Sequence, residues 1–355
     1  MPDVALHVNG AIYRNWKELG IHRGMDDLAG SFNLSITDPR LKTGEWLGGK
    51  RIKRGNACSV SIDGETVITG YVGKVRPRFT DTTKSISVTG RDTTGDLVDC
   101  SAINKPSEWS GYTLDRLVGE IVKPFGIKLH VQTDIGRPFE RFALQPGESA
   151  FQAIDRACKQ RGVLPMADGL GGLVLCRAGI GRHATALEEG KNLKAAGGDF
   201  SMDQRHSEYI VIGQQPGFET GAAADFAHGA ARVTDSAVMR YRPLMIVAEQ
   251  PGDGGNLKDR AIWECNTRIG RGDAVDATVF GWREHGLTGP LWKPNNLVRV
   301  KSPDLDFDGE LLIQSVDYNL KDGDGSDAGT TATLNLVRKE AFALLPAPPV
   351  KGLWQ

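Results

Sequence analysis

Apolar and polar residues alternate along the first part of the chain with the period of a β-strand. In SFNLSITD (31–38) and CSVSI (58–62) every second residue is apolar, which predicts strands with one buried face. Asn9-Gly10 and Asp63-Gly64 lie between such segments and indicate hairpins, because both turn positions need a positive φ. Gly70 falls inside the next strand pattern and predicts a β-bulge. Residues 1–98, the first block, are therefore expected to form antiparallel strands of a barrel or sandwich.

The spacing changes to that of amphipathic helices after about residue 99. Apolar residues recur three and four apart from Leu114 to Val122, after Thr113 as a candidate N-cap. Ser149 and Gln152 have the spacing of a capping box and predict the start of a second helix. Strand-like segments lie between the helices (KLHVQT) and after them (LGGLVLCRAG). Residues 99–182 are thus predicted to be a small α/β domain.

Strand patterns return over residues 183–342, the second block. They begin at Tyr209–Ile212 and continue from DATVFGW to TATLNLVRK after a helix predicted over 257–269. The Ala- and Gly-rich segment between has no periodicity, so 216–240 is expected to be a long loop. The proline-rich residues 343–355 are expected to form a C-terminal tail.

Composition narrows the class of protein. The 355 residues contain 43 Lys and Arg against 44 Asp and Glu, which excludes a general attraction to nucleic acid. No apolar run approaches a membrane span, and the first residues lack the pattern of a signal peptide, so we expect a soluble protein. The five cysteines are far apart, without a CxxC pair, and are expected to be buried thiols. The 44 glycines indicate many turns.

Several motifs resemble binding or catalytic sites but lack an essential residue. Gly44–Lys50 fits a phosphate-binding loop, yet Arg51 replaces the required Ser or Thr. Asp304–Gly309 begins like an EF-hand loop, but its twelfth position is Ser315, so an acidic turn is the main interpretation and a weak calcium site the alternative. The seven histidines form no HExxH motif. We therefore expect no metal, no cofactor and no enzymatic activity.

The densest group of charges is Lys50, Arg51, Lys53 and Arg54. A phosphate-binding patch is conceivable, but four cations in a balanced chain predict only weak, salt-sensitive binding. A solvated loop or an interface with an acidic neighbour fits better. We take these four residues, together with the Ala/Gly-rich loop, as candidates for subunit contacts.

Long segments of the chain resemble one known family in the order in which that family has them. They are YVGKVRPRFTDTTKSISVTGRDTTGDLVDCS (71–101), FALQPGESAFQAIDRACKQRG (142–162), EGKNLKAAGGDFSMDQRHSEYIVIGQ (189–214), GPLWKPNNLVRVKSPDLDFDGELLIQSVDYNL (289–320) and LNLVRKEAF (334–342). Together they are similar to baseplate hub proteins of contractile-tailed phages, in particular the Mu-like ones.

The resemblance implies a mainly β fold with an α+β insert: two tail-tube-like antiparallel β-barrels, at 1–98 and 183–342, and a small α/β domain at 99–182. It implies a homotrimer whose pseudo-hexameric ring joins the tail tube, or a distal tube-initiator protein, to the central spike. Other baseplate proteins are further expected partners, and phage DNA would pass through the channel without sequence-specific binding. The expected location is the virion tail baseplate, assembled in the host cytoplasm. The type VI secretion spike base is similar in plan.

Two functions of other classes stay open at this point. Residues 142–162 also resemble a LysM module, which favours a peptidoglycan-binding or lytic tail component acting on the host cell wall. A hydrolase is the second alternative, with catalytic residues that converge only in three dimensions.

Overall fold

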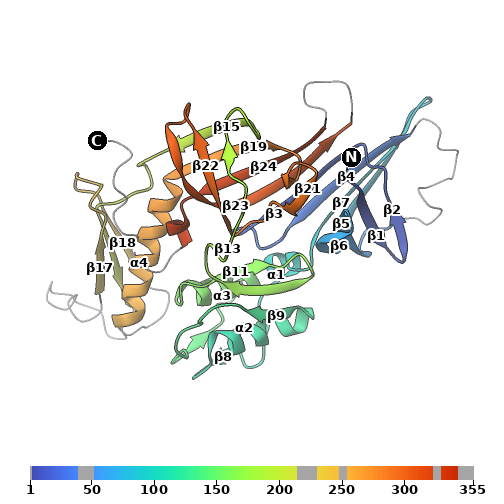
Figure 1. Cartoon of the computed structure of the whole chain (residues 1–355). Coiled ribbons are helices and arrows are strands. Elements are labelled where there is room, and N and C mark those ends of the chain that lie inside the picture. Colours follow the sequence, from blue (N-terminus) through green and yellow to red (C-terminus); the bar gives the residue numbers. More distant parts are fainter. Residues whose placement is uncertain (1, 39–51, 214–229, 248–253, 323–328, 343–355) are drawn as a thin grey trace.

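The computed structural model describes residues 2–38, 52–213, 230–247, 254–322 and 329–342. It is mainly β with few helices, as the sequence predicts (Figure 1). The predicted tail at 343–355 lies outside the described residues.

The first block contains seven strands: β1 (Val4–Val8), β2 (Ala11–Tyr13), β3 (Glu18–Gly24), β4 (Ser31–Asp38), β5 (Ala57–Ile62), β6 (Glu65–Phe79) and β7 (Lys84–Asp92). The Asn9-Gly10 turn joins β1 to β2, with φ of 51° and 72° at its two residues. The Asp63-Gly64 turn joins β5 to β6 in the same way. Both predicted hairpins are therefore confirmed.

The small domain packs two helices against a short sheet. Its elements are α1 (Gly95–Asp99), β8 (Glu108–Trp109), α2 (Leu114–Val122), a 3-10 turn (Lys123–Phe125), β9 (Lys128–Val131), β10 (Phe142–Ala143), α3 (Ala150–Lys159), β11 (Leu164–Ala167) and β12 (Gly172–Cys176). Ser149 Oγ accepts from the Gln152 N–H, and Gln152 Oε1 accepts from the Ser149 N–H, so the capping box is confirmed. Thr113 is the N-cap residue of α2, but its side chain makes no cap bond. The apolar sides of α2 and α3 share a separate buried core.

The second block holds the remaining elements: β13 (Gly181–Arg182), β14 (Leu187–Glu188), β15 (Leu193–Phe200), β16 (Glu208–Ile212), β17 (Ala230–Thr234), β18 (Pro243–Val247), α4 (Gly254–Arg271), β19 (Asp273–Phe280), β20 (Arg283–His285), β21 (Thr288–Leu291), β22 (Asn296–Ser302), β23 (Phe307–Lys321), β24 (Gly329–Val337) and a 3-10 turn (Lys339–Phe342). α4 confirms the helix predicted over 257–269 and is longer at both ends.

Part of the predicted loop 216–240 is a strand instead. Residues 230–234 form β17, which pairs antiparallel with β16, while β18 pairs parallel with β16 on its other side. α4 packs against this three-stranded sheet through Leu257 and Ala261 (Figure 1). The two alanines at the start of β17 concealed the strand, because alanine carries little strand signal. Residues 216–229 of the predicted loop lie outside the described part of the chain.

The two blocks share one sheet rather than forming two separate ones. Fourteen strands pair in the order β15-β19-β24-β23-β3-β4-β7-β6-β5-β1-β2, with β13, β14 and β22 beside this path. The first block joins the second where β3 pairs antiparallel with β23. One apolar core likewise runs through both blocks. Among the described residues, strand pairing does not close either block into a barrel.

Four strands of each block repeat the same arrangement. The order β3-β4-β7-β6 in the first block matches β15-β19-β24-β23 in the second, with every neighbouring pair antiparallel. β6 and β23 are each fifteen residues long. Each has an irregular register against its partner, at Gly73 in β6 and at Gln314 in β23. Aligning these two positions makes Arg76 equivalent to Asp317. The sheet formed by β16 to β18, together with α4, is inserted between β15 and β19 of the second copy.

The predicted bulge at Gly70 is wrong in position, because β6 has bulges three residues to either side of it. Val67 is an extra residue against β5, and Gly73 is an extra residue against β7. Gly70 has another role: a Cβ atom there would overlap the carbonyl oxygen of Arg91 on β7. A glycine inside a strand therefore marks a close approach of two backbones here.

Candidate subunit interface

The basic cluster predicted as an interface is only partly described. Lys53 and Arg54 lie in an exposed turn before β5, where the Lys53 N–H donates to Asn56 Oδ1 at 2.9 Å. Gly55 completes this turn with a φ of 81°. Lys50 and Arg51 lie outside the described residues. A role for this cluster in subunit contacts stays a prediction.

A charged cluster lies where β3 meets β23. His22 Nδ1 is 2.7 Å from Asp317 Oδ1 across the strand pair, and His22 Nε2 is 2.7 Å from Asp27 Oδ2. The hydrogen bond with Asp317 raises the pKa of His22, with a further contribution from Asp27, although burial acts in the opposite direction. The protonated imidazole can donate to both carboxylates. The junction of the two blocks is therefore fixed by an ion pair as well as by backbone hydrogen bonds.

A buried carboxylate lies at the end of β7, where the first block leads into the small domain. Asp92 accepts from the Thr93 hydroxyl at 3.0 Å and lies close to the start of α1. Burial raises its pKa to about 6, although hydrogen bonds from Thr94 and Thr93 and the charge of Arg23 act against this. Arg23 also donates to the carbonyl oxygen of Asp168 at 3.1 Å, which ties β3 to the small domain.

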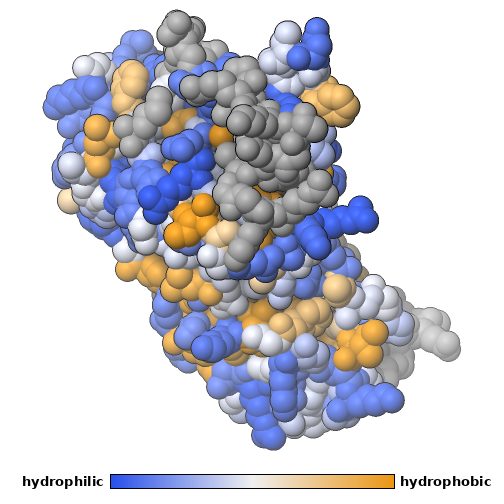
Figure 2. All heavy atoms as spheres, turned by 90° about the vertical axis from the view of Figure 1, so that its right-hand side faces the viewer, coloured by the Kyte–Doolittle hydropathy of each residue, from blue (hydrophilic) through white to orange (hydrophobic). Residues whose placement is uncertain are grey.

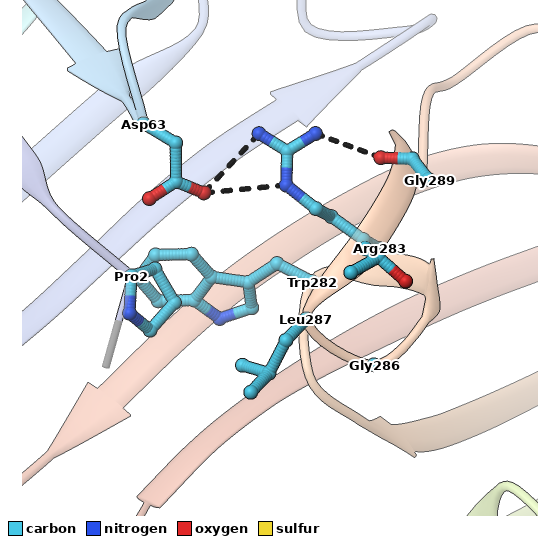
Figure 3. Close-up of a pocket in the computed structure, with 8 residues that line it drawn as sticks. Pro2, Asp63, Trp282, Arg283, Gly286, Leu287 and Gly289 are labelled. Carbon is cyan, nitrogen blue, oxygen red and sulfur yellow. Dashed lines mark hydrogen bonds and ion pairs between the residues drawn. The ribbon is translucent and has the colours of Figure 1, made fainter.

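A second link between the blocks surrounds Arg283 on β20. Its guanidinium contacts Asp63 Oδ2 at 3.2 Å and donates to the Gly289 carbonyl at 2.8 Å (Figure 3). Nearby, Lys293 Nζ lies 2.6 Å from Glu65 Oε1. Trp282 lines the adjoining pocket of about 370 Å³ (Figure 3). Two cations of the second block thus hold two carboxylates at the β5–β6 turn of the first.

Next to Arg283 on β20, Glu284 forms a buried pair with His183. His183 Nδ1 lies 2.7 Å from Glu284 Oε1, and both side chains are buried. The Lys293 N–H donates to His183 Nε2, so Nδ1 carries the ring proton and donates to Glu284. Burial would raise the pKa of Glu284, but hydrogen bonds from His183 and Thr185 bring it below its ordinary value. This arrangement fixes backbone position and offers no free nucleophile or base.

Two strand edges have no partner among the described residues. β5 pairs with β6 only as far as Tyr71, and the Gly55 N–H donates to the Val72 carbonyl just beyond. From Gly73 to Phe79 no described residue pairs with the side of β6 away from β7; we call this segment the β6 free edge. β15 is the end strand of the sheet, and within the described ranges it pairs with β19 alone.

Both edges expose aromatic side chains. Phe79 at the end of β6 is 84% exposed, and Phe200 at the end of β15 is 51% exposed. Apolar residues form separate patches among polar ones in the surface view, over the part of that face not covered by grey atoms (Figure 2). Open strand edges offer unpaired backbone groups to which another chain can add a strand.

The remaining motifs give no binding site in the described part of the chain, and Gly44–Lys50 lies outside it. Asp304–Gly309 covers the turn after β22 and the first residues of β23, where Asp308 forms an ion pair with Arg299 on β22 at 3.0 Å. No group of three or more His, Cys, Asp or Glu side chains gathers as a metal site in the residues that the structure covers. No helix within the described ranges is long and apolar enough to span a membrane. Four of the cysteines are buried thiols as expected, whereas Cys100 is exposed.

The LysM-like segment 142–162 contributes to the core of the small domain. Ala153, Ile154 and Ala157 on α3 are fully buried. Glu148 and Arg156 form an ion pair at 2.9 Å with both side chains more than nine-tenths buried. The segment's resemblance to a glycan-binding module is thus accounted for by packing, and glycan binding stays a prediction.

Family descriptions and a curated relative that match this chain are those of phage baseplate proteins. Three family descriptions match in chain order: "Mu phage baseplate assembly protein GpP-like, N-terminal" over residues 3–92, "Baseplate hub protein gp44-like, second domain" over 94–177, and "Mu phage baseplate assembly protein GpP, fourth domain" over 255–345. The baseplate hub protein gp44 of Escherichia phage Mu is 30% identical over 335 residues, which cover 91% of this chain and 85% of gp44.

Solved structures agree with this assignment. The 43 kDa tail protein of prophage MuSo2 from Shewanella oneidensis is 38% identical, with a TM-score of 0.81 over 96% of this chain and 99% of that one. A type VI secretion component, the E. coli c3393 protein, has a TM-score of 0.56 at 10% identity, over 97% of this chain and 80% of that one, and shares the fold alone. The curated relative and the matched family descriptions define a structural protein of phage tails. The chain belongs to the family of Mu-like phage baseplate hub proteins.

Sequence reasoning missed the residues of the two free edges. Arg76 and Phe79 lie beyond the strand pattern that the sequence analysis assigned, and Asp199 and Phe200 follow two glycines in a segment without alternation. A comparison of the two segments YVGKVRPRF and LIQSVDYNL could have found them. Each belongs to a long strand, and the third residue of each is the position where the strand register shifts.

Proposed function

We propose that three copies of this chain form a ring with pseudo-sixfold symmetry that joins the tail tube to the central spike of a contractile phage tail. The observation that carries this proposal is the four-strand unit repeated in the two blocks. A subunit with two equivalent units presents six of them when three copies assemble, so it matches a sixfold tube on one side and a threefold spike on the other. Kinship with a baseplate hub protein supports the same role.

The role is structural rather than enzymatic. The polar clusters around His22 and Asp92 lie where the first block meets the second block and the small domain, and the buried His183–Glu284 pair holds segments of the second block together. In this proposal the central channel lets phage DNA pass without reading its sequence. The protein is located in the tail baseplate of the virion and is assembled in the host cytoplasm. Its partners are the tail tube or a tube-initiator protein, the spike and other baseplate proteins.

Analysis of purified phage tails tests this role. We expect the chain at three copies per tail by quantitative mass spectrometry, and antibody labelling at the distal end of the tube. Phages that lack its gene should produce no complete tails. Absence of the chain from purified tails would contradict the proposal.

A pull-down on purified peptidoglycan examines the alternative function. A cell-wall role predicts that peptidoglycan retains the intact chain, and that substitutions on the exposed face of the small domain abolish this retention. If peptidoglycan does not retain the intact chain, the structural role is favoured.

A further inference from the structure

The internal repeat identifies what the β6 free edge lacks. In the second block, β22 pairs with β23 as far as Leu312, just as β5 pairs with β6 as far as Tyr71. Beyond Leu312 the same side of β23 is occupied by β3, from Ser315 to Lys321. The equivalent side of β6, from Lys74 onward, is empty among the described residues.

The repeat also identifies the strand that fits there. β3 is the outer strand of its four-strand unit, and its equivalent in the other unit is β15. Within the described part of one chain β15 does not pair with β6: the two strands are the two ends of the open eight-strand path β15-β19-β24-β23-β3-β4-β7-β6. A second copy of the chain can supply it. We propose that the β6 free edge binds β15 of a second copy, antiparallel and in the register in which Arg76 lies opposite Asp199.

The register follows from the strand pairs already present. Asp317 is equivalent to Arg76, and it pairs with His22. His22 pairs with Ser31 in β4, as Asp199 pairs with Ala274 in β19, which makes His22 equivalent to Asp199. The His22–Asp317 ion pair within the chain is thus replaced by an Arg76–Asp199 pair between chains. The signs of the two charges are exchanged but remain complementary.

A second charge pair accompanies the first. In the same register Arg78 lies opposite Gly197 of β15. Gly197 has no side chain, and its partner in β19 is Asp276, which is exposed. Arg78 can therefore reach Asp276 past Gly197, since side chains directly across and one strand further lie on the same face. Arg76, Arg78 and Asp199 are all exposed in the single chain. Two arginines of one copy would meet two aspartates of the next.

The opposite face of the proposed strand pair is apolar. Val75 would lie opposite Phe200, and Phe79 opposite Ala196, so that a large side chain meets a smaller one at both ends. In β23 the equivalents of Val75 and Phe79 are Val316 and Leu320, and both are buried. Pairing with β15 would cover Phe79 and Phe200, the two aromatic residues that the free edges expose. Pro77 between them lacks an N–H, so it can only accept a hydrogen bond in this pair.

Disulfide trapping tests the register. Cys100→Ser removes the exposed native thiol, and in that background Arg76→Cys is combined with Asp199→Cys, and Thr80→Cys with Ala195→Cys. Each pair lies directly opposite in the proposed register, at the Cα separation that a disulfide needs. The exchanged pairs, Arg76→Cys with Ala195→Cys and Thr80→Cys with Asp199→Cys, are about 13 Å out of register. Oxidation should link separate chains in the first two variants and not in the exchanged ones.

Charge exchange provides a second, independent measurement. Arg76→Asp or Asp199→Arg alone should weaken association of purified chains about two- to fivefold per contact, because like charges would face each other. The double variant should restore association. Arg91→Asp is the matched control, since Arg91 is exposed on β7 and pairs with Asp99 away from both edges.

The inference rests on the proposed ring, and the outcomes separate the two. If tails contain the chain but disulfides form only in the exchanged variants, or in none, the register is wrong and the hub role is unaffected. Tails that lack the chain contradict the hub role. Purified chains at high concentration that show neither linking nor charge rescue overturn the strand pairing itself.

Discussion

Replacing Asp92 by asparagine should change how the stability of the protein depends on pH. Asp92 is 3% exposed, and burial raises its pKa from 3.8 to about 6. The folded state therefore holds this proton more tightly than the unfolded state does. As the pH rises from about 4 to about 6, the unfolded chain loses the proton first, and the free energy of unfolding falls. Above pH 6 the full cost of a buried charge is present.

The shift of about two pH units corresponds to about 3 kcal/mol, at 1.36 kcal/mol per unit. Asp92→Asn removes the charge and keeps an oxygen that can accept from Thr93 and Thr94. The difference in free energy of unfolding between variant and native protein should then increase by about 3 kcal/mol between pH 4 and pH 7. Only this change with pH is diagnostic, because any difference in packing of the amide is the same at every pH.

Urea unfolding followed by tryptophan fluorescence at several pH values measures it. Asp81→Asn, which removes an exposed carboxylate from the β6–β7 turn, is the control and should follow the native protein throughout. If the difference between Asp92→Asn and the native protein stays constant from pH 4 to pH 7, the assignment of a buried, proton-binding Asp92 is wrong.

Three further substitutions test the packing of the blocks and of the small domain. His22→Gln should reduce the free energy of unfolding more at pH 6 than at pH 9. The pKa of His22 is raised in the folded state, so its ion pairs stabilise the fold while the ring is protonated and are lost as the pH rises. Urea midpoints that shift equally at both pH values would contradict this. Gly70→Ala should destabilise the protein by about 3 kcal/mol or prevent folding, since the new Cβ would overlap the Arg91 carbonyl. Gly119→Ala is the control: there is open space around its Cβ, so it should be neutral or stabilising in thermal unfolding. Ser149→Ala should lower the free energy of unfolding by about 1 kcal/mol and Ser149→Asp should restore it, because either oxygen can cap α3; equal loss in both would argue against the cap.

Local features of the fold could be predicted because neighbouring residues determine them. The Asn9-Gly10 hairpin needs only its two turn residues, and the Ser149–Gln152 capping box only a spacing of three. The pairing of β3 with β23 could not be predicted in this way, since His22 and Asp317 are 295 residues apart. The residues of neither strand indicate which other strand it pairs with. Two predicted barrels consequently appear as one shared sheet.

The free edges were hidden for a different physical reason. A strand whose faces are both exposed has no alternation of apolar and polar residues, and β15 is such a strand, with Gly197 and Gly198 near its end. The free half of β6 mixes arginines with Pro77 and Phe79 for the same reason. These segments gain a buried face only in an assembly. Single-chain patterns are therefore weakest where subunits meet.

Electron cryomicroscopy of the assembled tail tests the central claim most directly. We predict a ring of three copies around an open channel between tube and spike, in which β15 of each copy pairs with β6 of the next and Arg76 lies opposite Asp199. A baseplate without this chain, or a ring whose copies meet through other surfaces while both edges stay open, would contradict the account.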